Sequence, residues 1–374
     1  MRHTGKYQKL GNISSFIPDP LPPIDPPLAL TPEITNLYGQ ASFNLGQLNE
    51  MAQRVPDQKR FIKAYVIKEA LLSSAIEGIH TTLIDIFTQP LSEIAPSKET
   101  QLVLNYTQSL EVALNLLQKE GLPISSRLIL AAHQALMSGG VGEKANPGNY
   151  RKQAVRVGDL VPPSAEKIPD LMNALEQYIN QDSDLPTLIR IGLVHVQFET
   201  IHPFLDGNGR IGRLLIVLML IDGDLLKTPI LYPSYYFKKN HLEYYQRLDR
   251  VRTHGDFEGW IVYYLKAIAA SAADAQHRAK EIESLESELK EFIQADPRLT
   301  PLQENALLVL TLLFQQPVVT ISEVSRRINK AYNTASNIIT QFVATGILIE
   351  DKEKKRNKMY RFDTYLKLLE KEYE

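Results

Sequence analysis

The sequence predicts a mainly helical protein that ends in a winged helix-turn-helix domain. Apolar residues recur every three or four positions over most of the chain, as in residues 60–79 and 99–118, which is the period of a helix with one buried face. Segments with a strand-like period of two are scarce. After the Asp296-Pro297 step the order is helix, turn, helix and two short strand-like segments, as in a winged helix-turn-helix.

The segment that precedes these helices is rich in proline. Residues 16–33 contain seven prolines, which remove backbone donors and fix φ, so this segment is expected to be an extended arm. Its apolar residues favour an arm that packs against the body of the protein, and a disordered arm is the alternative. The interleaved apolar residues are Leu21, Ile24, Leu28 and Leu30.

Further helices and one hairpin follow from the same reading. A short β-hairpin is expected at residues 150–159, where Val155 and Val157 alternate with Arg156 ahead of Pro162-Pro163. The last long helix should stop at Asp296, because a residue before proline is disfavoured in a helix. The expected helices are 125–138, 168–180, 186–199, 209–221, 241–252 and 257–293, and the expected domains are 1–110, 111–295 and 296–374.

Composition excludes several classes of site. The 374-residue chain has a net charge of −2 and a pI near 6.5, so it has no overall attraction to nucleic acid or anionic membrane. It contains no cysteine, which rules out disulfides, thiolate metal sites and a cysteine nucleophile. Residues 1–16 lack the apolar core of a signal peptide, and the longest apolar run, 214–221, is too short to span a bilayer. We expect a cytoplasmic protein with no membrane segment.

The most informative segment is His202-Pro-Phe-Leu-Asp206-Gly207-Asn208-Gly209-Arg210-Ile-Gly-Arg213, which lies between two expected helices. Glycines 207 and 209 allow φ > 0 and let backbone N–H groups approach a ligand, while the next helix begins at the same point and favours an anion. Arg210 and Arg213 are three apart and can reach one polyphosphate together.

The same segment contains a metal ligand and a base. Asp206 fits Mg²⁺, which binds through one or two carboxylates together with substrate phosphates. His202 can accept a proton from a hydroxyl near neutral pH. Each residue also has an ordinary explanation, since a lone histidine is usually structural and Asp or Gly-Asn-Gly is common in turns. Their conjunction at fixed spacing favours a triphosphate site.

The segment resembles the signature of the Fic family, His-Pro-Phe-x-Asp/Glu-Gly-Asn-Gly-Arg-x-x-Arg, and matches every fixed position. The resemblance implies an all-helical Fic-type catalytic core that transfers AMP to a Tyr, Ser or Thr hydroxyl of a protein. It implies that His202 is the general base and Asp206 the Mg²⁺ ligand. It further implies that Asn208 and the amides of Gly207 and Gly209 hold the α-phosphate, Arg210 the next phosphate, and Arg213 the γ-phosphate.

A second motif lies upstream. Ser73-Ser-Ala-Ile-Glu77-Gly78 is similar to the inhibitory motif of the Fic subclass with an N-terminal inhibitory helix. A glutamate near Arg213 would pair with it in a bidentate manner and withhold it from the γ-phosphate. The alternative is that Glu77 is only a carboxylate at a helix end that Gly78 caps.

Two further assignments rest on position within the Fic resemblance. The 150–159 hairpin, with Val155, Arg156 and Val157, occupies the place of the flap that aligns a target segment by strand addition, although it is otherwise an ordinary surface hairpin. Tyr244 and Tyr245 resemble the aromatic pair near the adenine, although aromatic residues on a helix are more often core. His133 and His195 have no partner at metal-ligand spacing and are interpreted as core residues.

The C-terminal region, residues 320–362, is predicted to contain a first helix at 322–328 and a recognition helix at 331–345. Residues 352–358 hold five basic residues and one acid, which fits a wing that contacts a phosphate backbone. Protein docking or dimerisation is the alternative use of such a domain. The polar residues suited to base or phosphate contacts are Asn333, Thr334, Ser336, Asn337 and Gln341.

The sequence therefore predicts an ATP- and Mg²⁺-dependent protein adenylyltransferase that is autoinhibited by Glu77 through Arg213. Its partners would be ATP and a hydroxyl-bearing protein, with the chain itself among the candidate targets. DNA binding through 320–362 and a homodimer are both left open. The rival from another class is a DNA-binding transcription regulator with a nucleotide-sensing Fic domain. A Fic enzyme that removes AMP, or that uses another nucleotide or a phosphodiester donor, also fits the signature.

Overall fold

The computed structural model describes residues 2–10, 13–54, 58–139, 142, 145–351 and 358–371. The chain forms two compact units, and it passes from one to the other within helices α2 (Gln58–Ile76), α4 (Lys98–Leu114) and α11 (Phe257–Ala295) and after residues 54 and 80. Unit 1 comprises residues 1–54, 65–80 and 101–273, and unit 2 comprises 55–64, 81–100 and 274–374. The domain boundaries expected at 110 and 296 stay a prediction.

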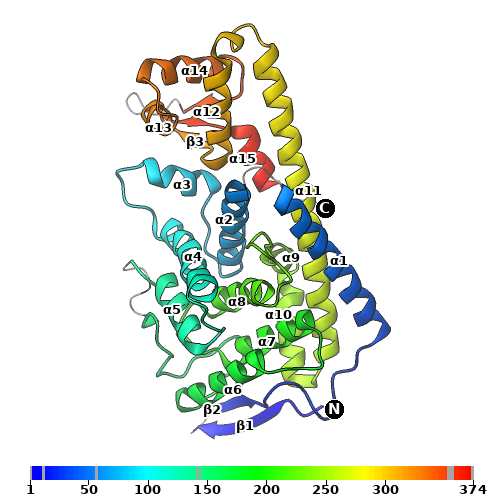
Figure 1. Cartoon of the computed structure of the whole chain (residues 1–374). Coiled ribbons are helices and arrows are strands. Elements are labelled where there is room, and N and C mark those ends of the chain that lie inside the picture. Colours follow the sequence, from blue (N-terminus) through cyan, green and yellow to red (C-terminus); the bar gives the residue numbers. More distant parts are fainter. Residues whose placement is uncertain are drawn as a thin grey trace. The chain divides into compact units, whose positions relative to one another are not determined.

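Unit 1 is built from helices around two that are almost wholly buried, α7 (Thr187–Ile201) and α8 (Asn208–Asp222). These two helices lie side by side and are joined by residues 202–207 (Figure 1). Both have buried apolar residues all round the helix, as expected of helices that neighbours surround. The others are α1 (Pro32–Arg54), α4 (Lys98–Leu114) with a π-helical turn (Asn115–Lys119), α5 (Ser126–Leu136), α6 (Ile168–Asn180), α9 (Ser234–Lys239), α10 (His241–His254), and parts of α2 and α11, with a 3₁₀ turn at Ala165–Lys167.

Unit 1 begins with an antiparallel hairpin that the sequence did not predict. Strand β1 (Gly5–Leu10) pairs with β2 (Ile13–Pro18) in a register that places Gly5 opposite Pro18. The predicted extended arm is observed beyond β2, since residues 19–31 form no helix or ladder strand. The arm lies against the body, because Gln197 donates to the carbonyl of Asp19 and Arg2 donates to the carbonyls of Pro26 and Pro27.

The hairpin predicted at residues 150–159 is wrong in its extent. The only regular pairing in this segment is one bridge between Val157 and Leu160, which closes a tight turn with reciprocal backbone hydrogen bonds of 2.9 Å. A strand needs a partner strand for its backbone hydrogen bonds. Here β2 contacts the chain just beyond the segment instead, where the N–H of Phe16 donates to the carbonyl of Val161. Val155 and Val157 alternate as in a strand, but no second strand lies beside them.

Unit 2 combines short helices with a small antiparallel sheet of order β3-β5-β4. The predicted helices 322–328 and 331–345 appear as α13 and α14, while the predicted strands are shorter than expected and β3 was not predicted. Residues 352–357 of the predicted wing lie outside the described residues. The elements are α3 (Leu83–Thr88), a 3₁₀ turn (Gln89–Leu91), a second 3₁₀ turn (Thr300–Leu302), α12 (Gln303–Gln315), β3 (Val318–Val319), α13 (Ile321–Arg327), α14 (Tyr332–Ala344), β4 (Ile349–Glu350), β5 (Tyr360–Arg361) and α15 (Asp363–Glu370).

In the described part of the chain, no helix combines the length and the apolar character needed to cross a bilayer.

Candidate active site

The connection between α7 and α8 carries the predicted signature and has an unusual backbone. His202 ends α7 with φ +51°, and Gly207 precedes α8 with φ +81°, both in the left-handed region. The expectation of φ > 0 at Gly209 is wrong, because Gly209 lies in the first turn of α8. Glycine is needed there for space instead: a Cβ on residue 209 would collide with Oε1 of Glu77 and with Nη1 of Arg213.

Side chains on either side of the loop fix its shape. Asn208 closes it, because its Oδ1 accepts from the N–H of Phe204 (2.8 Å) and its Nδ2 donates to the Phe204 carbonyl (2.9 Å). The ring of His133 stacks on Phe204 at 3.7 Å between centroids, and its Nε2 lies 3.1 Å from the Asp206 carbonyl. Nδ1 of His133 accepts from the N–H of Gly148, so Nε2 carries the proton. His133 is buried as predicted, and it supports the loop.

Hydrogen bonds from Arg151 fix the backbone of His202. The buried Arg151 guanidinium donates from Nε to the His202 carbonyl (2.8 Å), from Nη1 to Gln153 and from Nη2 to Pro163, and the Arg151 N–H donates to the Pro203 carbonyl (2.9 Å). Sequence reasoning missed Arg151, because a set of carbonyls from different segments leaves no local pattern.

The imidazole of His202 is suited to accept a proton. Burial lowers the pKa of His202 to about 4, so the ring is neutral at pH 7. The Glu199 carbonyl opposes this shift, although Nδ1 is buried and makes no hydrogen bond of standard geometry within the described part of the chain.

Asp206 and Arg210 meet at the start of α8. Oδ1 of Asp206 accepts from the N–H of Gly207 (2.6 Å) and from Nη2 of Arg210 (3.2 Å), and the Asp206 side chain is 63% exposed. The Arg210 side chain is buried. Its Nε and Nη1 are buried too and have no hydrogen-bond partner among the described residues. Burial lowers the pKa of Arg210, since its charge is only partly compensated by Asp206. Such unpaired donors are uncommon in folded proteins and suit an incoming anion.

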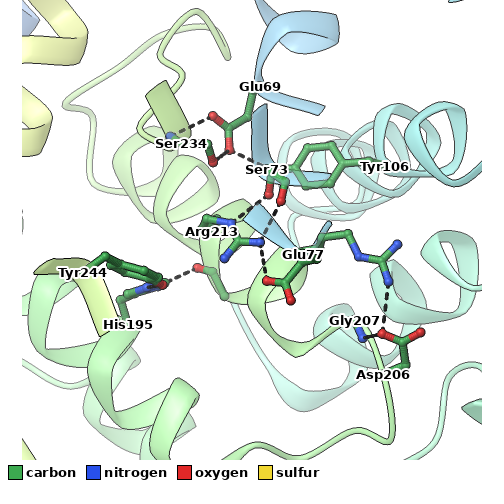
Figure 2. Close-up of polar contacts among 12 residues, drawn as sticks. Glu69, Ser73, Glu77, Tyr106, His195, Asp206, Gly207, Arg213, Ser234 and Tyr244 are labelled. Atoms are coloured by element: carbon green, nitrogen blue, oxygen red, sulfur yellow. Dashed lines mark hydrogen bonds and ion pairs between the residues drawn. The ribbon is translucent and has the colours of Figure 1, made fainter. Parts of the chain in front are cut away.

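Arg213 makes three hydrogen bonds with described residues, to Ser73 in the last turn of α2 and to Glu77 just after it (Figure 2). Its Nη2 donates to Oε1 of Glu77 (2.8 Å) and to the Ser73 carbonyl (2.9 Å), and its Nε donates to Oγ of Ser73 (2.9 Å). The side chains of Arg213 and Glu77 are 1% and 35% exposed. Burial lowers the pKa of Arg213, but the charge of Glu77 outweighs it and raises the pKa above its ordinary value.

The predicted contact between Glu77 and Arg213 is therefore present, in a form that differs from the expected one. Among the described residues Glu77 binds through one oxygen, and Ser73 takes the other guanidinium bonds that a bidentate pair would have used. Gly78 follows the end of α2 with φ +75°, so the capping explanation for this motif also holds. The residues of the signature and the upstream motif meet in unit 1.

Residues 123–220 match the Fic/DOC family. This match contains the whole signature. Residues 35–115 match the N-terminal model of the same family, and they contain Ser73, Glu77 and Gly78. The Glu77–Arg213 ion pair therefore joins the two Fic/DOC regions.

Similar proteins have related names. A stretch of 211 residues is 30% identical to "Protein adenylyltransferase Fic" of Nematostella vectensis, over 54% of this chain and 47% of that protein. A stretch of 159 residues is 30% identical to "Protein adenylyltransferase fic-1" of Caenorhabditis elegans, over 42% and 30%. The chain thus spans less than half the length of these curated relatives.

Solved structures share the fold. A Fic family protein from Desulfovibrio desulfuricans superposes with a TM-score of 0.57 at 22% identity, over 90% of this chain and 98% of that one. Fic-1 of C. elegans superposes with a TM-score of 0.54 at 21% identity, over 67% and 75%. The mainly helical fold is therefore that of known Fic structures.

Two glutamates next to the Fic/DOC signature, the buried Glu69 and the partly exposed Glu199, were not found from the sequence. Burial raises the pKa of Glu69 to about 7, although Ser234 and Arg213 favour its charge. Burial also raises the pKa of Glu199 to about 7, with Arg213 acting in the opposite direction, and its Oε1 has no hydrogen-bond partner in the described residues. Both glutamates lie on regular helices, where a charge on one face is usually solvated, so no local pattern distinguishes them from surface residues.

The tyrosine pair on α10 is divided between core and surface. Tyr244 is buried and its hydroxyl donates to Nε2 of His195 (2.8 Å), while Nδ1 of His195 donates to the Gly212 carbonyl (3.0 Å). His195 is a core residue, as predicted. Tyr245 is 45% exposed, and burial raises its pKa to about 12, with the charge of Glu77 contributing. Tyr245 is thus the ring of this pair with surface available to a ligand.

The candidate target-binding segment beyond Arg151 is exposed. Arg156 and Val157 are at the surface and Val155 is half-buried. The backbone N–H groups of residues 152–156 make no hydrogen bond with any described residue. This stretch of the Fic/DOC region is anchored at its start, because Arg151 ties it to the carbonyl groups of His202 and Pro203.

Proposed function

We propose that this protein transfers AMP from ATP to a Tyr, Ser or Thr hydroxyl of a protein, its own chain included, and that Glu77 restrains this activity. The observation that carries the proposal is the buried, unpaired Nε and Nη1 of Arg210 at the start of α8, in the same loop as a neutral His202. The names of the relatives, which are protein adenylyltransferases, support it.

The start of α8 would hold the triphosphate. The amide of Gly209 and the positive end of the helix would face the α-phosphate, and the unpaired donors of Arg210 would take the next one. The amide of Gly207 donates to Oδ1 of Asp206 in the structure, so it would reach the α-phosphate only after Asp206 releases it. Asn208 would act on the α-phosphate through the loop shape that it fixes, since both its side-chain polar atoms are bonded to Phe204. Arg213 would bind the γ-phosphate after Glu77 leaves it.

Asp206 fits a Mg²⁺ ligand. Both of its hydrogen bonds use Oδ1, and the side chain is exposed, so Oδ2 can bind a cation. Within the described residues there is no group of three or more His, Cys, Asp or Glu that could hold a metal. One carboxylate is sufficient for Mg²⁺ when phosphate oxygens and waters complete its shell. When bound, the ion would neutralise charge on the leaving pyrophosphate.

His202 would act as the base. Its neutral ring accepts the proton of the target hydroxyl while the oxygen bonds to the α-phosphorus, and the bond to the β-phosphate oxygen breaks to release pyrophosphate. Arg151 orients the ring by fixing the backbone that carries it. The target segment would align along the unpaired N–H groups of residues 152–156 and bring its hydroxyl to His202. Tyr245 would contact the adenine.

Glu77 would inhibit transfer by occupying the guanidinium group of Arg213. While the Glu77 carboxylate binds Arg213, this arginine is not available to the γ-phosphate. ATP can then bind only in a pose in which the α-phosphate is misplaced for attack by the target hydroxyl. Residues 35–115 support this reading, because the Fic/DOC N-terminal match contains the inhibitory motif.

Unit 2 has the order of elements of a winged helix-turn-helix, with α13 and α14 followed by β4 and β5, and we include this fold in the proposal. Asn333 and Asn337 are exposed on α14, while Arg326 and Arg327 of α13 both pair with Glu323. A nucleotide-sensing regulator that binds DNA through this unit is the function that the experiment below must separate.

The test uses ATP labelled at the α-phosphate, with ATP labelled at the γ-phosphate as control, and the Glu77→Gly protein as enzyme. We expect protein-bound label from the α-position alone, and none in the Glu77→Gly/His202→Ala double variant. ATP binding without label transfer, together with retention of duplex DNA, would refute the enzyme and support the regulator. Label from the β- or γ-phosphate, or transfer only from another nucleotide, would contradict ATP as the AMP donor.

A further inference from the structure

Glu69 lies on α2 eight residues before Glu77 and is buried, with 2% exposure. Its Oε1 accepts from Oγ of Ser234 (2.5 Å) and from the hydroxyl of Tyr106 (3.3 Å), and its Oε2 accepts from the N–H of Ser234 (3.1 Å). Figure 2 shows these bonds on the side of Ser73 away from Glu77. One carboxylate therefore joins α2 to α4 and to the first residue of α9.

The contacts of Glu69 are strong for physical reasons. Ser234 donates to the Glu69 carboxyl group from both its N–H and its hydroxyl, at the first residue of α9. A buried carboxylate that loses such partners is left unsatisfied, which is more costly than the loss of one exposed bond. Glu69 thus anchors the last turns of α2 to α4 and α9.

Those last turns provide every hydrogen bond that Arg213 makes within the described residues. Ser73 lies one turn beyond Glu69, and its carbonyl and Oγ both bind the guanidinium. Glu77 lies one further turn along and binds Nη2. A displacement of α2 by less than one turn would break all three bonds, because hydrogen bonds weaken steeply with distance and angle.

We propose that Glu69 is a positioning residue for the restraint on Arg213: by binding Ser234 and Tyr106 it holds the end of α2 where Ser73 and Glu77 reach the guanidinium. This inference rests on the proposed function for its effect on nucleotide binding, but not for its effect on α2. Loss of the Glu69 contacts frees the end of α2 and with it Arg213.

The deciding measurement is hydrogen exchange of the amides of Glu77, Gly78 and Ile79, which donate to the carbonyls of Ser74 and Ala75. The variants are Glu69→Ala, Ser234→Ala and Glu69→Gln. Arg190→Ala is the matched control, since Arg190 donates to three carbonyls at the end of α6 and does not contact α2.

Loss of the buried hydrogen bonds of Glu69 is worth about a tenfold change in an equilibrium, so exchange at 77–79 should rise about tenfold in Glu69→Ala. Ser234→Ala removes only the hydroxyl donor, so it should show a smaller rise, and it is the variant to use if Glu69→Ala does not fold. Glu69→Gln, which keeps one acceptor oxygen, should restore part of the protection. If exchange at 77–79 is no faster than in Arg190→Ala, the proposal is overturned.

A second arm measures ATP affinity in the presence of Mg²⁺. Glu69→Ala should bind ATP more tightly than the unaltered protein, and this gain should be smaller when Glu77 is already replaced by glycine, because only the Ser73 contacts are then left to release. Equal gains in both backgrounds would show that Glu69 does not act through Glu77. If Glu77→Gly itself fails to bind ATP more tightly, the proposed function fails, and the exchange arm still decides the role of Glu69.

Discussion

Replacing Glu77 should release Arg213 and strengthen ATP binding. Two variants separate charge from shape: Glu77→Gly removes the side chain, and Glu77→Gln keeps its length and one acceptor oxygen. In the structure only Oε1 of Glu77 bonds to Arg213, at 2.8 Å, so either change acts on a single charge-assisted contact. The Ser73 contacts to Arg213 remain in both variants.

The size of the effect follows from burial. A hydrogen bond to a charged group contributes about 1.5–3 kcal/mol. Because Glu77 is 35% exposed, solvent screening places this contact near the lower limit. About 1.5 kcal/mol corresponds to roughly a tenfold change in affinity. We expect Glu77→Gly to bind ATP about tenfold more tightly and to label itself about tenfold faster, with Glu77→Gln between it and the unaltered protein.

Calorimetric titration with ATP and Mg²⁺ gives the affinity, and α-labelled ATP gives the rate. Arg213→Ala in the Glu77→Gly background is the control, because it should abolish the gain in affinity. The reasoning is refuted if both Glu77 variants match the unaltered protein in ATP affinity and in labelling, or if the gain survives the loss of Arg213.

Three further predictions concern Arg151 and two titrating groups. Arg151→Lys cannot bond to the same set of carbonyls, so labelling in the Glu77→Gly background should fall at least about tenfold while calorimetric ATP affinity stays constant; a parallel loss of affinity would contradict a role in orienting His202. The pKa of His202 is about 4, so the ring stays neutral between pH 5 and 8, and its titration should lower the labelling rate only below about pH 5. A fall in the rate centred near pH 6.5 would contradict this. The pKa of Glu69 is raised from 4.5 to about 7, so its stabilising contribution is complete below pH 4.5 and is lost as the pH rises through 7. In denaturant titrations over this pH range, the unfolding free energy of the unaltered protein relative to Glu69→Gln should drop by up to about 3 kcal/mol. A rise in this difference with pH would refute the assignment.

The sequence predicted what depends on neighbouring residues. The spacing of residues 202–213 specifies a loop that opens a helix, and the structure places His202, Asp206 and the two arginines accordingly. The Glu77–Arg213 contact spans 136 positions, and it was predicted only through resemblance to a family motif. Arg151 and Glu69 bind groups brought together by folding, so no local pattern indicated them.

The errors have related causes. Val155 and Val157 have the alternation of a strand, but pairing depends on a partner, and β2 approaches the segment at Val161 instead. The hairpin formed by β1 and β2 was missed because its polar residues resemble those of a surface loop. At Gly209 the predicted positive φ is wrong, and the structure shows that a Cβ there would meet the ends of the Glu77 and Arg213 side chains instead.

The left-handed backbone of His202 lowers the stability of the fold at a position where the proposed activity requires a histidine. A residue with a Cβ loses about 1 kcal/mol in that conformation relative to glycine, and the buried Nδ1 adds a further cost. Glycine would suit this corner between two helices better than histidine does. Thermal unfolding of a His202→Gly protein should therefore occur at a higher temperature than that of His202→Ala, and a protein selected for stability alone would have no imidazole here.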